Sequence, residues 1–87
     1  MFMNGKINER KEIDELRKFL SEAIRKDPKQ ADEAMIKVTE TMIQLIREID
    51  SDKVYQVTQA YRDIYSTFSE YISEEAKKKI KEIIDSI

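Results

Sequence analysis

The residues best suited to chemistry in this sequence are its four tyrosines, which all fall in the stretch YQVTQAYRDIYSTFSEY at positions 55–71. Catalysis at neutral pH usually draws on histidine or cysteine, and the chain has neither. An enzyme would therefore need a carboxylate, a lysine or a tyrosine with a shifted pKa, and only tyrosine lies on the apolar stripes of the predicted helices. We expect no catalytic activity and no cofactor.

The charge around these tyrosines argues against a stacking platform for nucleic acid. Such a platform interleaves aromatic rings with lysine and arginine, which neutralise phosphate. Residues 51–72 contain two basic side chains, Lys53 and Arg62, against three acidic ones, so the segment has a net charge of −1. The tyrosines are better explained as parts of a helical core or of a surface for another protein.

Spacing separates these two roles. Positions 54, 57, 61, 64, 68 and 71 repeat at intervals of three and four residues, which predicts the inward side of a helix for Val54, Val57, Tyr61, Ile64, Phe68 and Tyr71. Tyr65 flanks this stripe and Tyr55 lies well off it. Because tyrosine is enriched in protein interfaces, Tyr55 and Tyr65 are the candidates for a partner surface.

Composition predicts an all-α fold. The chain has 87 residues, of which 40% are hydrophobic and 39% charged, with one glycine and one proline. That leaves too little turn chemistry for a sheet, whose turns recur every ~8–12 residues. We expect a flexible arm at residues 1–7 and a single helical domain at 8–87. Its architecture should be a small antiparallel bundle of four helices, with three helices, the last one long, as the alternative.

Capping residues mark where the helices begin. Asn8 can cap the first helix, and Asp27 can cap the second, with Pro28 at its first position and Gln30 completing a capping box. One of the residues 50–52 should cap the third. Ser73, followed by two glutamates, should cap the fourth, because the helical phase changes near residue 72.

The second predicted helix has an apolar arc wider than packing on one side requires. Its core positions are widened by Ile36, Ile43 and Ile46. This helix is therefore either central in the fold or shared with another copy. The second interpretation predicts a homodimer with these three isoleucines as the self-interface.

Two basic features are candidates for a partner surface. Arg10, Arg17 and Arg25 lie in register along the first predicted helix, and KKKIK occupies positions 77–81. Nearby acids offset both, and the whole chain carries a formal net charge of −2. Nucleic-acid binding is thus a possible but disfavoured alternative to binding another protein. With no apolar stretch near the ~20 residues of a membrane span, we expect a cytoplasmic protein.

The stretch EIDELRKFLSEAIRKD at 12–27, together with the four-helix plan, resembles the small immunity proteins that protect bacteriocin producers. Those proteins are antiparallel four-helix bundles of about this size. The resemblance covers the helix pattern and transfers no site residues. The sequence therefore predicts a small non-catalytic regulator, adaptor or inhibitor that binds protein and self-associates, with an immunity-like protein as an alternative.

Overall fold

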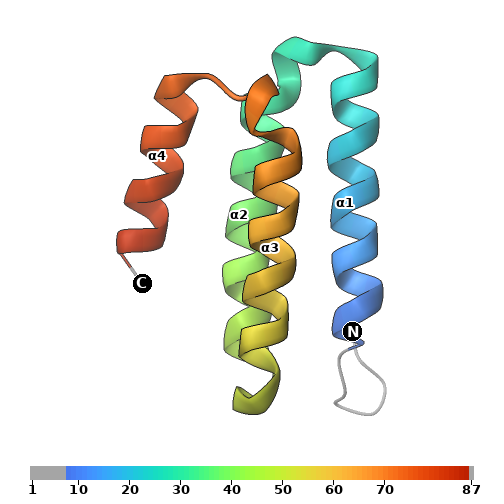
Figure 1. Cartoon of the computed structure of the whole chain (residues 1–87), viewed down its shortest axis with the longest axis vertical. Coiled ribbons are helices and arrows are strands. Elements are labelled where there is room, and N and C mark those ends of the chain that lie inside the picture. The colour runs from blue at the N-terminus through green and yellow to red at the C-terminus, as the bar shows by residue number, and fades with distance from the viewer. Residues whose placement is uncertain (1–7, 87) are drawn as a thin grey trace.

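Four α-helices follow one another in residues 8–86, the part of the chain that the computed structural model describes (Figure 1). They are α1 (Glu9–Lys26), α2 (Ala31–Glu48), α3 (Val54–Phe68) and α4 (Glu74–Asp85). Short 3-10 turns at Pro28–Gln30, Ser51–Lys53 and Ser69–Tyr71 connect them. Residues 8–86 contain no strand. The all-α, four-helix prediction is confirmed. The predicted arm at 1–7 lies outside the described residues.

Three of the predicted caps are present. Asn8, Asp27 and Ser73 each accept a hydrogen bond, 3.1 Å long, from a backbone N–H two or three residues further along the chain. The predicted capping-box role of Gln30 is wrong. The Asp27 N–H that Gln30 would need to reach is already bonded to the carbonyl of Ala23 at 3.0 Å, because Asp27 also ends α1.

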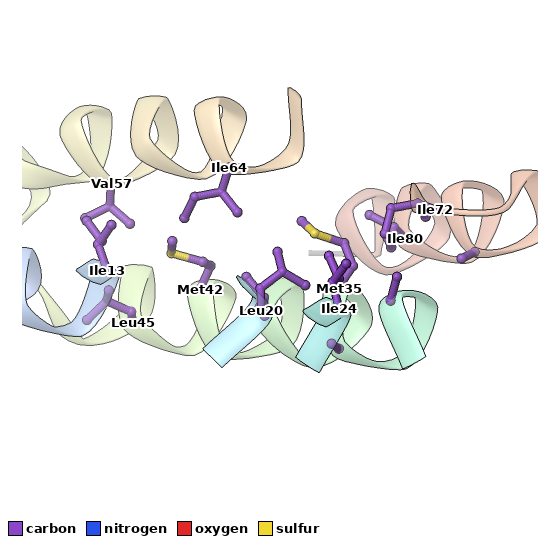
Figure 2. Packing of buried hydrophobic residues seen from close by; sticks show 14 residues of the cluster. Ile13, Leu20, Ile24, Met35, Met42, Leu45, Val57, Ile64, Ile72 and Ile80 are labelled. Carbon is purple, nitrogen blue, oxygen red and sulfur yellow. The ribbon is translucent and has the colours of Figure 1, made fainter. Parts of the chain in front are cut away.

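The helices share one apolar core (Figure 2). Its largest fully buried side chains include Leu20 of α1, Met35 and Met42 of α2, Ile64 of α3 and Ile80 of α4. Helices of this length would be only marginally stable alone in water, and burial of these apolar side chains against one another is what stabilises them. An ion pair at the surface adds a link between α1 and the 3-10 turn before α3, since Lys53 Nζ lies 3.0 Å from a carboxylate oxygen of Glu9.

Helix α2 is central, because α1, α3 and α4 all pack against it. Helices α2 and α4 run in the same direction, with α1 and α4 on opposite sides of α2 in Figure 1. By contrast, α3 and α4 make little contact with each other. The wide apolar arc of α2 thus follows in large part from its position between three neighbours within one chain.

A polar contact fixes where α4 begins. The carboxylate of Asp32, in the first turn of α2, accepts hydrogen bonds from the backbone N–H of Ser73 at 2.8 Å and from its hydroxyl at 2.6 Å. Ser73 Oγ in turn accepts from the backbone N–H of Ala76. The N-terminal ends of α2 and α4 are therefore held side by side.

One core prediction is wrong. Tyr71 continues the spacing of the α3 stripe, yet 47% of it is exposed. The reason is that α3 ends at Phe68 and the chain tightens into a 3-10 turn, which rotates Tyr71 away from the core. Ile72, the next residue, is buried instead.

We expect Asp32→Ala to lower the free energy of unfolding by about 1–2 kcal/mol, because it removes two hydrogen bonds to a charged acceptor. Urea denaturation followed by circular dichroism measures this loss. Glu33→Ala is the matched control, since it removes a carboxylate from the same helical turn. Equal stability of the two variants would show that the contact with Ser73 does not hold α4.

Candidate functional site

An apolar groove lies between α2, α3 and α4, with a volume of about 900 Å³. Its residues come from one face of each helix: Thr39, Met42, Ile43 and Ile46 of α2; Thr58, Tyr61, Arg62, Tyr65 and Ser66 of α3; and Glu74, Lys77, Lys78, Ile80, Lys81 and Ile84 of α4. Most of its lining surface is carbon. It is the most prominent candidate site in residues 8–86.

The groove exists because α4 is short and packs on α2 instead of α3. Helix α4 has 12 residues and α2 has 18. With ~1.5 Å of rise per residue and their N-terminal ends held together, α4 ends about 9 Å before α2 does. Ile43 and Ile46, in the C-terminal half of α2, are therefore only half-buried, and Ile84 at the end of α4 is 40% exposed.

The floor of the groove holds a pair of hydroxyls. Thr39 is buried, with 1% of its surface exposed, and its Oγ1 donates to the carbonyl of Met35 at 2.8 Å. Its single proton is used in that bond, so the phenol of Tyr61, 2.6 Å away, donates to Thr39 Oγ1. Both hydroxyls are thereby satisfied within the protein.

Burial of this phenol changes its titration. Removal from water raises the pKa of Tyr61. The ring of Tyr65 lies beside it, with centroids 6.1 Å apart and planes tilted by 48°. Together the two rings form the α3 wall of the groove.

The rim of the groove is basic. Arg62 lies on the α3 side, and Lys77, Lys78 and Lys81 lie on the α4 side. Glu74 is the one carboxylate among the lining residues, and it pairs with Lys77 at 3.3 Å. The lining therefore carries a formal net charge of +3, in a chain whose net charge is −2.

The structure divides the residues predicted as interfaces. Ile43, Ile46 and Tyr65 line the groove, whereas Ile36 faces shallow hollows on the other side of α4. The three isoleucines therefore line separate hollows. Tyr55 is 71% exposed and is not part of the groove lining.

The arginines of α1 also lie outside the groove. Arg10, Arg17 and Arg25 are all exposed. Arg10 borders a shallow hollow that also contains Asp14 and Glu15. The lysine run is divided, with Lys79 facing the opposite side of α4 from Lys77 and Lys81.

Sequence reasoning missed the combination of Arg62, Lys77, Lys81 and Ile84 into one site. The signal was present in part, since residues 77, 81 and 84 share a helical face. What the sequence lacked was the position of α4 relative to α3. Thr39 was also missed, because a polar residue within an apolar arc reads as part of the surface.

Other kinds of site are not seen in the part of the chain that the structure describes. Residues 8–86 contain no group of three or more acidic side chains close enough together to hold a metal ion. None of their helices combines the length and the apolar character needed to cross a bilayer.

Comparison with models of protein families, with curated proteins and with solved structures finds no significant match to this chain. The function proposed below therefore depends on the geometry of the groove.

Tyr61 should make the protein sensitive to alkaline pH. Its pKa is raised in the folded state, so its contribution to the free energy of unfolding is complete below pH ~10 and falls as pH rises through the folded-state pKa. We expect Tyr61→Phe to remove this part of the alkaline decline and the last component of the tyrosinate absorbance titration. Tyr55→Phe, at an exposed ring, is the control. An identical decline in both variants would contradict the assignment.

Proposed function

We propose that this chain is a non-catalytic protein-interaction module that binds a helix of its partner in the groove between α3 and α4. The observation that carries the proposal is that α3 and α4 both pack on α2 but hardly on each other. An apolar channel is left where a further helix would contact all three. Binding of an amphipathic helix in such a groove is a recurrent mode of peptide recognition.

The dimensions of the groove fit this mode. Its lining spans residues 58–66 of α3 and 74–84 of α4. At ~1.5 Å per residue these walls are about 12–15 Å long, which matches between two and three turns of a bound helix. A helix laid there would complete a bundle around Ile43 and Ile46 and cover the exposed part of Ile84.

The polar groups of the groove also support a binding role over catalysis. The hydroxyls of Thr39 and Tyr61 bond to each other and to a backbone carbonyl, so they are occupied within the protein. The aromatic rings of Tyr61 and Tyr65 present large, rigid contact area, which is characteristic of binding hot spots.

The self-association predicted from sequence is one form of this proposal. Of its three isoleucines, Ile43 and Ile46 are in the groove and available to a second copy, while Ile36 packs on the other side of α4. The partner of the groove is thus either a second copy of the chain or a different protein. These two cases differ in the mass of a crosslinked product.

A photo-crosslinking side chain distinguishes the two tyrosines predicted as partner contacts. We expect Tyr65→p-benzoylphenylalanine, in the cells from which the gene comes, to give a discrete protein adduct on illumination, because position 65 lines the groove. The same substitution at Tyr55, which is exposed and outside the groove, should give none. Mass spectrometry of the adducts identifies the partner.

A second variant links the adduct to the groove. Ile43→Lys places a charge on the apolar floor and should abolish crosslinking from position 65, whereas Gln44→Lys, at the exposed neighbouring position, should not. Absence of any adduct from position 65, or an adduct that Ile43→Lys leaves unchanged, would refute the proposed function.

A further inference from the structure

We propose that the partner helix is acidic and amphipathic and belongs to a protein other than a second copy of this chain. This inference rests on the proposed function and adds the chemistry of the partner. It follows from the basic side chains on the rim of the groove, which would attract the carboxylates of a partner helix and repel a second basic groove.

The floor of the groove requires an apolar stripe on the partner helix. Met42, Ile43 and Ile46 lie along α2, and Ile80 and Ile84 lie along α4. A helix placed over them buries apolar side chains at intervals of three and four residues, on a single stripe between two and three turns long. The remainder of that helix stays at the rim or in solvent.

The rim of the groove requires acidic side chains beside that apolar stripe. Lys77 and Lys81 are one helical turn apart on the α4 wall, and Arg62 faces the groove from the α3 wall. A helix lying between these walls places the residues that flank its apolar stripe next to cations on both sides. Glutamate or aspartate at those positions would form ion pairs, whereas lysine or arginine would be repelled.

The spread of the cations favours a helix over a small amphiphile. A fatty acid also has an apolar tail and a negative end, but its single carboxylate would meet only one of these cations. Arg62 on the α3 side and Lys78 and Lys81 on the α4 side, with Lys77 already paired to Glu74, match a ligand with carboxylates distributed along its length. Helices present charges in this way on both edges of an apolar stripe.

The same charges argue against a second copy. One form of two-fold dimer places the two grooves face to face. The lining of each carries a formal charge of +3, so like charges would meet across the axis. Asp14 and Glu15 of α1 share a hollow with Arg10, Lys11 and Lys18, so this surface does not present the row of carboxylates that the groove of a second copy would bind.

A displayed peptide library tests this preference directly. The probes are 16-residue helices with leucine fixed at one stripe, glutamate or lysine randomised at the flanking positions, and alanine or glutamine elsewhere. We expect selection on the wild-type protein to enrich glutamate over lysine about tenfold or more at the flanks. Binding of a selected peptide should weaken about tenfold when NaCl is raised from ~50 to ~500 mM.

Charge reversal of the groove provides the matched comparison. The variant with Lys77→Glu and Lys81→Glu should select lysine at the same flanking positions. The variant with Lys79→Glu and Lys29→Glu changes charge equally at two exposed lysines outside the groove lining. It should select glutamate, as the wild type does.

The outcomes separate this inference from the proposed function. Helices that bind in a manner abolished by Ile43→Lys, but with no preference for glutamate, would overturn the acidic partner and leave helix binding intact. Dimerisation of the wild type that Ile43→Lys abolishes would show that a second copy fills the groove. The fatty acid dodecanoate is tested as a separate probe. If no helix binds, or if dodecanoate binds and no helix does, both proposals fail.

Discussion

The packing of three helices on α2 is the constraint on which the rest of this structure depends. An 18-residue helix with an apolar arc this wide must be covered on more than one side, and α1, α3 and α4 share that task. The carboxylate of Asp32 sets the position of the last of these by binding Ser73, the cap of α4. Because α4 packs against α2 in this position, it does not also pack closely against α3.

The groove results from this packing of α4 on α2. In a closed four-helix bundle, each helix packs against two neighbours and the core is sealed on all sides. Here α4 ends before α2 does, so Ile43, Ile46 and Ile84 keep exposed surface that a closed bundle would bury. The hydrogen bond between Thr39 and Tyr61 helps to hold the floor rigid and satisfies both hydroxyls. A rigid apolar floor beneath a basic rim is well suited to binding, since little order has to be created on association.

Features that depend on neighbouring residues could be predicted from the sequence. The caps at Asn8, Asp27 and Ser73 follow from side chains that bond within three residues, and the exposure of Tyr55 follows from its phase on the helix. Features that depend on distant elements could not be predicted. A helical stripe shows which side of α4 faces inward but not which helix it meets, so neither the contact between Asp32 and Ser73 nor the basic walls of the groove could be foreseen.

The accessibility of the isoleucine methyl groups tests the open groove most directly. With these methyls labelled for NMR, a soluble paramagnetic probe can be added to the dilute protein and the broadening of each signal measured. An open groove should give strong broadening for Ile43, Ile46 and Ile84, and protection for Ile64 and Ile80, which are 1% exposed. Protection of all five alike would mean that the groove is closed or filled in solution, which is the opposite of the open groove described above.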